Sequence, residues 1–140
     1  MLLSHSYPTT QGWDFNFEPA KTGDEYLKLI ADPDAKIIRS HEDFYKFVKA
    51  DPKLRKVFNS DLMRKFTARM KFARGGLQTF HYGDLKRKYP RNYKAILRRM
   101  APGFGLSPEL MLTTDYDDMY CASTATCKTD TFSICIGANC

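Results

Sequence analysis

Four cysteines lie within the last twenty residues, and no other position of the 140-residue chain is a cysteine. They are Cys121, Cys127, Cys135 and Cys140. Thiols bind metal ions, pair as disulfides or attack electrophiles as thiolates. Structural zinc sites usually present thiolates in close pairs such as Cys-x-x-Cys, whereas gaps of five, seven and four residues separate these cysteines. The spacing therefore predicts no metal site.

A disulfide-bonded tail fits the spacing better, and four cysteines allow three pairings. Disulfides persist in oxidising compartments. The opening residues MLLSHSYPTT lack the basic region and the long apolar stretch of a secretory signal, and no apolar run approaches the roughly 18 residues of a membrane span. We therefore expect the chain to be made and first kept in the cytoplasm, without a membrane partner.

Hydroxyl side chains are interleaved with the thiols of the tail. When a serine or threonine loses water, the alkene that forms is an electrophile, and a neighbouring thiolate adds to it as a thioether. The short spacing makes ring closure entropically cheap. The candidate dehydration sites are Ser123, Thr124, Thr126, Thr129, Thr131 and Ser133.

This tail resembles the core peptide of a lanthipeptide, one family of ribosomally synthesised and post-translationally modified peptides (RiPPs). The resemblance implies thioether rings on the four thiols, in a pattern that the sequence leaves open. It also implies cleavage between Thr113 and Cys121 and a secreted antimicrobial product, a bacteriocin. The implied partners are a dehydratase and cyclase, a leader protease and an exporter.

A second resemblance lies near the N-terminus. Phe15, Asn16, Phe17 and Glu18 are similar to the F-N-L-D/E box of lanthipeptide leaders, with Phe in place of Leu. Such a box binds the dehydratase as an added edge strand, which implies an enzyme-recognition role for these four residues. The alternative is an aromatic segment docked on the folded part of the chain.

The elements between these two ends are predicted to be helices. Capping pairs at Thr22 and Ser40, and a cap at Ser60, precede apolar residues at helical spacing. Gly75-Gly76 is expected to close the fourth helix. The prediction is an all-α fold, divided into an irregular recognition segment (1–21), a helical leader domain (22–112), an acidic linker (113–120) and a non-globular core peptide (121–140).

Charge is distributed unevenly along the chain. Between Ala35 and Ala101, 19 Lys and Arg stand against 5 Asp and Glu, so this part carries +14 and the flanks carry −8 of the net +6. The basic side chains could form a solvated helix face, bind nucleic acid, or dock an acidic enzyme surface or the acidic linker. The densest run is Lys86, Arg87, Lys88, Arg91, Lys94, Arg98 and Arg99, with Tyr89 and Tyr93 among them.

Common catalytic motifs are missing from the sequence. It contains no GxSxG, HExxH, P-loop or GxGxxG, and His5, His41 and His81 are far apart. We therefore predict no catalytic residues, no enzyme activity and no cofactor. The main hypothesis is a RiPP precursor with a folded leader. The alternatives are a basic helical nucleic-acid-binding module with a Cys-rich redox or metal tail, and a small exported disulfide-bonded protein.

Overall fold

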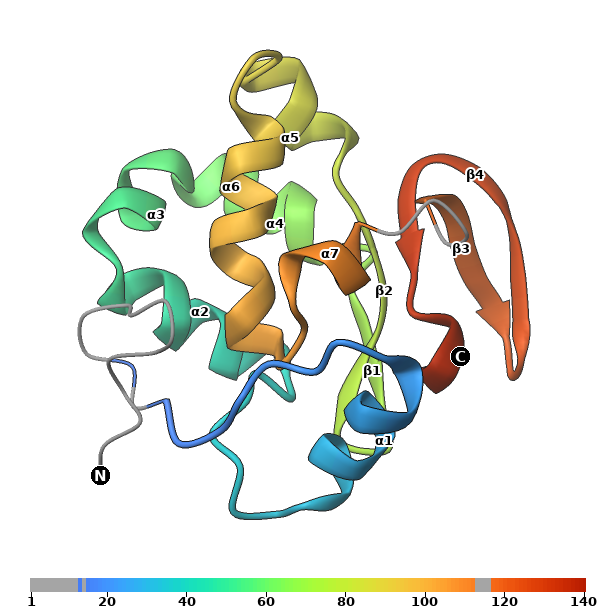
Figure 1. Ribbon diagram of the computed structural model, residues 1–140. Helices are drawn as coiled ribbons and strands as arrows, with labels where there is room; N and C mark the ends of the chain where they lie inside the picture. Colours follow the sequence, from blue (N-terminus) through green and yellow to red (C-terminus); the bar gives the residue numbers. More distant parts are fainter. Residues whose placement is uncertain (1–12, 14, 113–116) are drawn as a thin grey trace.

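Short helices and one antiparallel sheet make up the computed structural model, which describes residues 13, 15–112 and 117–140 (Figure 1). The α-helices are α1 (Gly23–Ala31), α2 (His41–Ala50), α3 (Pro52–Val57), α4 (Ser60–Thr67), α5 (Gly83–Lys88), α6 (Tyr93–Met100) and α7 (Pro108–Met111). The strands are β1 (Lys71–Ala73), β2 (Gly76–His81), β3 (Asp117–Ser123) and β4 (Thr126–Cys135), with 3-10 turns η2 (Ala101–Phe104) and η3 (Gly137–Asn139). Among the described residues, no helix is both long and apolar enough to cross a membrane.

The all-α prediction is wrong, because four strands form a sheet in the order β1-β2-β4-β3 and the fold is mixed α/β. Gly75 and Gly76 do not close a helix. Arg74 and Gly75 both have positive φ and form the two-residue turn between β1 and β2, as a tight hairpin requires. The tail predicted to be non-globular supplies β3 and β4. Its threonines, Phe132 and Ile134 have high strand propensity, so the same residues that suggest thioether chemistry also favour a β-hairpin.

The helix starts follow the predicted capping residues closely. Thr22 and Ser40 accept backbone hydrogen bonds from Glu25 and Asp43 at the first turns of α1 and α2. Asp51 ends α2 and caps α3, where Pro52 takes the first position. The start of α4 differs by one residue, because Asn59 rather than Ser60 is the cap.

An aromatic core holds the helices against β2. The ring of Phe44 stacks on those of Phe66 and Phe104, with centroids 5.6 and 5.7 Å apart. Phe80 of β2 and Leu97 of α6 complete this cluster, and all five side chains are buried. Burial of such large side chains is the main source of stability in a chain of this length.

The hairpin of β3 and β4 lies on the opposite side of β2 from helices α2, α3 and α6 (Figure 1). Beyond β4, the turn η3 returns to the body and packs on α1. Gly23 lies so close to Ala138 that a Cβ atom on Gly23 would be 3.0 Å from that of Ala138. We refer to residues 15–112 as the body and to residues 117–140 as the C-terminal hairpin.

Candidate functional site

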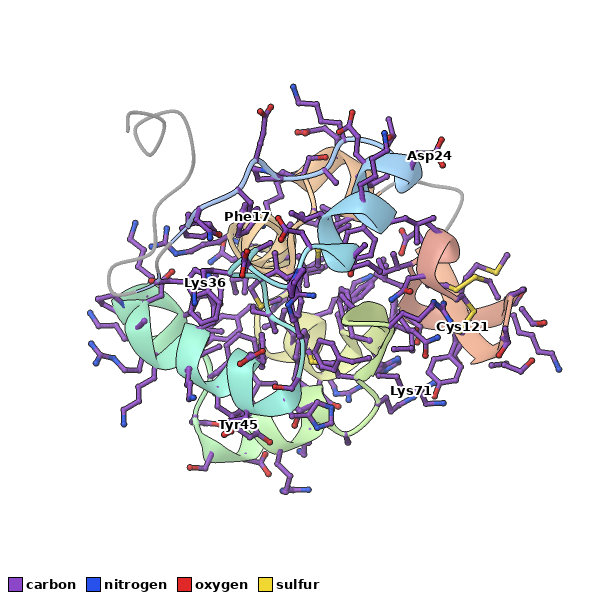
Figure 2. The ribbon with its side chains drawn as sticks, turned by 90° about the horizontal axis from the view of Figure 1, so that it is seen from below. Phe17, Asp24, Lys36, Tyr45, Lys71 and Cys121 are labelled. Atoms are coloured by element: carbon purple, nitrogen blue, oxygen red, sulfur yellow. A yellow bond between two sulfur atoms is a disulfide. The ribbon has the colours of Figure 1, made fainter. Side chains whose placement is uncertain are left out.

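Two disulfides cross-link the C-terminal hairpin within itself. Cys121 pairs with Cys140 and Cys127 with Cys135, over Cα–Cα distances of 5.7 and 6.0 Å. Both distances fall in the normal range for disulfides. Figure 2 shows these bonds beside Cys121, at the edge of the molecule. Every cysteine of the chain is used in this way, so no disulfide ties the hairpin to the body.

Backbone pairing with β2 attaches the hairpin to the body. Thr79 and His81 are opposite Cys135 and Ser133 in the antiparallel ladder, which covers three residue pairs. At the ladder's ends, the N–H of Tyr82 donates to Phe132 and that of Ile136 donates to the carbonyl of Gln78. The attachment is therefore short and non-covalent.

Asn139 is the most completely bonded side chain at this junction. Its Nδ2 donates to the carbonyls of Ala73 (2.9 Å) and Leu77 (3.2 Å), and its Oδ1 accepts from Nε of Arg74 at 3.0 Å. Asn139 is fully buried. A buried amide with three partners fixes the position of the chain end, because an unpaired one would be costly.

A polar cluster forms a second contact between body and hairpin. The guanidinium of Arg69 bonds to the carboxylate of Asp130, and Ser133 Oγ donates to the same carboxylate at 2.5 Å. His81 Nδ1 lies 3.0 Å from Ser133 Oγ and 3.1 Å from the guanidinium. In a catalytic triad the acid contacts the imidazole nitrogen remote from the serine, whereas here the acid and the serine share Nδ1 and Ser133 is buried. The cluster is a docking contact.

The surroundings of this cluster shift two pKa values downward. Burial, followed by the positive charge of Arg69, lowers the pKa of His81. The hydrogen bond from Ser133, with further help from Arg69, lowers the pKa of Asp130. The docked state therefore favours a neutral imidazole opposite an ionised carboxylate.

Cations of the body also lie over aromatic rings of the hairpin. Arg69 and Lys71 are 4.9 and 4.7 Å from the ring centroid of Tyr120, and Lys86 is 4.3 Å from that of Phe132. Such cation–π contacts each contribute about 0.5–1 kcal/mol at exposed sites. Docking of the basic residues on the acidic linker, one of the alternatives from sequence, stays a prediction, because these contacts are made to uncharged rings.

The candidate dehydration sites occupy different environments in the hairpin. Ser123 and Thr124 are exposed around the β-turn, and Thr126 is half-buried. Thr129 and Thr131 are exposed along β4. Ser133 is buried in the polar cluster. Thioether formation at these positions stays a prediction, and Thr113 and Thr114 lie outside the described residues.

The recognition segment predicted near the N-terminus is docked on the body. Asn16 is an exposed residue whose side chain donates to the carbonyl of Asp34 and accepts from the N–H of Lys36, both at 2.8 Å. Phe17 is buried, Phe15 meets the edge of Phe47, and Glu18 is exposed. This arrangement is the one expected for a docked aromatic segment, while recognition by a modifying enzyme stays a prediction.

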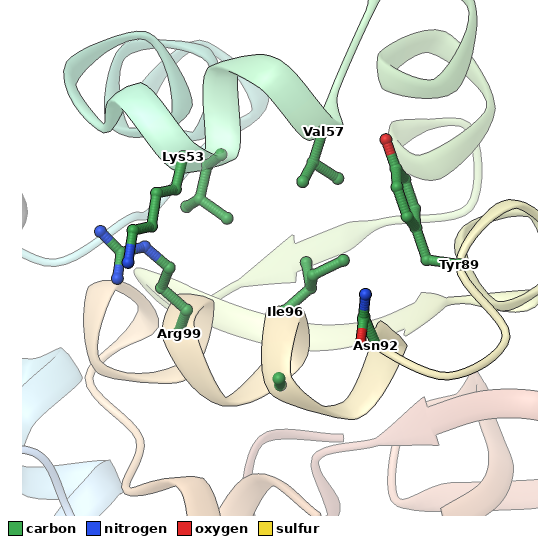
Figure 3. A pocket seen from close by; sticks show the side chains of 8 residues that line it. Lys53, Val57, Tyr89, Asn92, Ile96 and Arg99 are labelled. Carbon is green, nitrogen blue, oxygen red and sulfur yellow. The ribbon is translucent and has the colours of Figure 1, made fainter.

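A groove of about 360 Å³ lies between α3 and α6 (Figure 3). Leu54, Val57 and Ile96 form its apolar floor, Tyr89 stands at one end, and Lys53 and Arg99 lie at the other. Lys53 is exposed, and no carboxylate among the described residues pairs with it. The same holds for Arg91, Lys94 and Arg98, which do not line the groove.

Arg99 differs from its basic neighbours because it has a buried partner. Its guanidinium donates to both carboxylate oxygens of Asp51, at 2.6 and 2.9 Å. Burial alone would raise the pKa of Asp51, but Arg99 and the N–H groups of Lys53 and Leu54 hold it below its usual value. Arg99 therefore joins α6 to the start of α3 and belongs to the structure of the groove wall.

The side chains that bind the hairpin were missed in the sequence. Arg69, Arg74 and His81 lie in or beside β1 and β2, far along the chain from their partners in the tail. No local motif marks such pairs. The signal that could have indicated them is the opposite charge of the middle and the end of the chain.

The chain matches no model of a known protein family, no curated protein and no solved structure. Its function is therefore argued from the geometry.

Proposed function

We propose that the chain is the precursor of a cross-linked peptide, in which the body holds the C-terminal hairpin until cleavage of the preceding linker releases it. One observation carries this proposal: both disulfides close within the hairpin, and none reaches the body. A single cut before Asp117, where β3 begins, would therefore leave two chains joined only by non-covalent contacts.

The contacts at the junction suit a peptide that is held and then released. They include a three-pair ladder, the Asn139 site, the Arg69–Asp130 cluster, cation–π contacts and the burial of Ile134 and Ile136 in the core of the body. The two cross-links would preserve the hairpin after it leaves, since short free hairpins are marginally stable in water. The released hairpin would be a secreted product, because its disulfides persist in oxidising surroundings. An antimicrobial activity of the product is part of the same proposal.

The experiment is a mass analysis of the protein and of secreted peptides from the native producer, before and after reduction and alkylation. We expect a peptide that begins near Asp117 and contains Cys140. Its mass should be lower than that of the reduced sequence only by the hydrogens lost in forming two disulfides. All four thiols should alkylate after reduction.

Two other outcomes have distinct meanings. Losses of water, with thiols that resist alkylation after reduction, would show that thioethers form in place of the disulfides. That outcome would still support the precursor proposal. Recovery of only the intact chain from cells and medium would refute the precursor proposal. An engineered protease site at 113–116 provides the reference peptide. The control carries the same site added after Cys140, where cleavage does not separate the hairpin from the body.

The groove between α3 and α6 favours a second candidate function, binding of single-stranded nucleic acid. Tyr89 is half-buried at one end of the groove, and Lys88 Nζ lies 5.7 Å from its ring centroid. Lys53, which pairs with no carboxylate among the described residues, lies at the other end of the apolar floor. Proteins that bind single strands combine aromatic stacking with positive charge in this way.

We expect Tyr89→Ala to weaken binding of a short single-stranded oligonucleotide by about tenfold, as the loss of one stacked base would. Fluorescence anisotropy at several salt concentrations measures this, and wild-type affinity should fall steeply as salt rises. Tyr45→Ala is the matched control, because Tyr45 is an exposed tyrosine of α2 (45% exposed) that does not line the groove. Equal affinities of the two variants would contradict this candidate.

A further inference from the structure

Three of the four sulfur atoms of the hairpin form one compact cluster, and the fourth is bonded to one of the three. The Sγ atoms of Cys121, Cys135 and Cys140 all lie within 4.8 Å of one another, and these three residues are buried. The fourth, Cys127, is bonded directly to Cys135 and is half-buried. The long gaps in sequence are bridged because β3 and β4 place Cys121 opposite Cys127.

This spacing is close to that of a tetrahedral metal site. Zinc binds thiolates at about 2.3 Å, which separates neighbouring sulfurs in a tetrahedral site by about 3.8 Å. When the disulfides are reduced, the two sulfurs of each pair must move apart to a non-bonded distance, which is similar to the separation in a tetrahedral zinc site. The Cys135 sulfur lies at most 4.8 Å from the sulfurs of Cys121 and Cys140, so it needs to approach them by no more than about 1 Å.

One cation lies near the chain end that carries Cys140. Arg74 bonds to Asn139, the residue before Cys140. Arg69 and Lys71 contact Tyr120, whose side chain lies on the opposite face of β3 from that of Cys121. Four thiolates around Zn²⁺ have a net charge of −2, which a nearby cation offsets in part.

One carbonyl group faces the cluster. Ser123 O lies 3.6 Å from Cys121 Sγ and 3.3 Å from Cys140 Sγ, and it would repel thiolates. Ser123 is the exposed last residue of β3, next to the two-residue turn, so zinc binding requires the chain there to shift this carbonyl.

We propose that the reduced chain binds one Zn²⁺ through Cys121, Cys127, Cys135 and Cys140, and that the zinc site and the two disulfides are alternative states of the same sulfurs. Zinc binding converts four thiols to thiolates and releases their protons, without transfer of electrons. The newly made chain carries these thiols before either disulfide forms. This site does not depend on the proposed precursor function.

The test uses the full chain, reduced and kept free of oxygen, and titrates it with Co²⁺ as a spectroscopic substitute for Zn²⁺. We expect one Co²⁺ per chain, with the visible absorption of a tetrahedral site, a thiolate charge-transfer band and loss of both on adding Zn²⁺. The oxidised chain should bind no metal. Cys127→Ser should lose the four-thiolate spectrum.

Two results would overturn the site: no tetrahedral Co²⁺ spectrum in the reduced chain, or the same spectrum and affinity in Cys127→Ser. Thermal unfolding gives an independent measurement. Zn²⁺ should raise the melting temperature of the reduced chain and leave that of the oxidised chain unchanged. A reduced chain that is unfolded without metal remains testable, because zinc would then induce folding.

Discussion

At the scale of single residues, the junction between body and hairpin depends on a few fully bonded polar groups. Asn139 satisfies two carbonyls of the β1–β2 hairpin and orients Arg74. Because it is buried, its loss would remove a hydrogen bond from each of these carbonyls where water has no ready access, although the Leu77 carbonyl keeps the bond from the Tyr26 hydroxyl. The amide therefore has a larger effect than its size suggests.

We expect Asn139→Ala to lower the free energy of unfolding by about 2–3 kcal/mol, measured by urea denaturation of the oxidised protein. Asn16→Ala is a matched control. Asn16 also makes two hydrogen bonds to backbone groups but is exposed, so water replaces them and the loss should stay below about 1 kcal/mol. Similar losses in the two variants would show that burial of Asn139 has no special role.

At the scale of elements, the two cross-links constrain the hairpin unequally. The Cys121–Cys140 bond spans 19 residues and both partners are buried, whereas the Cys127–Cys135 bond spans 8 residues and has one half-buried partner. A longer loop removes more conformational entropy from the unfolded chain. The first bond also joins the end of the chain to β3.

We expect the double variant Cys121→Ser/Cys140→Ser to lose about 3 kcal/mol of stability, and Cys127→Ser/Cys135→Ser to lose somewhat less, about 2.5 kcal/mol or below. Denaturation of each variant under oxidising conditions, with the remaining disulfide confirmed by mass, measures the order. A larger loss from the shorter link would contradict the argument from loop length.

The first helices could be predicted from the sequence, whereas α7 and the sheet could not. Caps at Thr22, Ser40 and Asp51 act on neighbouring residues, so local signals suffice. The pairing of β2 with β4 joins residues more than fifty positions apart and leaves no local mark. Gly75 was ambiguous, because a residue with positive φ suits both a helix end and a tight turn.

At the scale of the whole molecule, a basic body and an acidic hairpin are held together in part by groups that titrate. His81 faces Arg69 and Asp130, with Asp84 and Arg87 also near enough to influence it. The lowered pKa of His81 means that the docked state favours its neutral form. The contribution of His81 to the stability of the docked state is complete above the ordinary histidine pKa of about 6.5. It is lost as pH falls through the lower pKa of the docked state.

We therefore expect acid to loosen the hairpin. In protein cut at an engineered site within 113–116, the dissociation constant of the hairpin should rise as pH falls from about 7.5 to 5.5. Analytical size exclusion without reductant, or calorimetric titration, measures this. His81→Gln, which stays neutral, should flatten the pH dependence over this range, and tighter binding in acid would contradict the assignment.

The sequence indicates the residue types of the candidate site but not how they lie in space. The cysteines and their neighbouring hydroxyls are recognisable by type, and the opposed charges of the middle and the end are visible in the composition. The absence of Cys-x-x-Cys pairs predicts no metal site, but the spacing of such pairs describes only distances along the chain. In the folded hairpin the relevant distances run across strands, where Cys121 and Cys127 are opposite each other.

The contact between Gly23 of α1 and Ala138 of η3 makes the first helix sensitive to whether the hairpin is in place. An emptied body would expose the first turn of α1, and its amide hydrogens would exchange with solvent faster than in the loaded state. The exposure of the first turn of α1 would thus depend on whether the hairpin, at the other end of the chain, is still bound. A protein that recognises that helix turn could then distinguish emptied bodies from loaded ones.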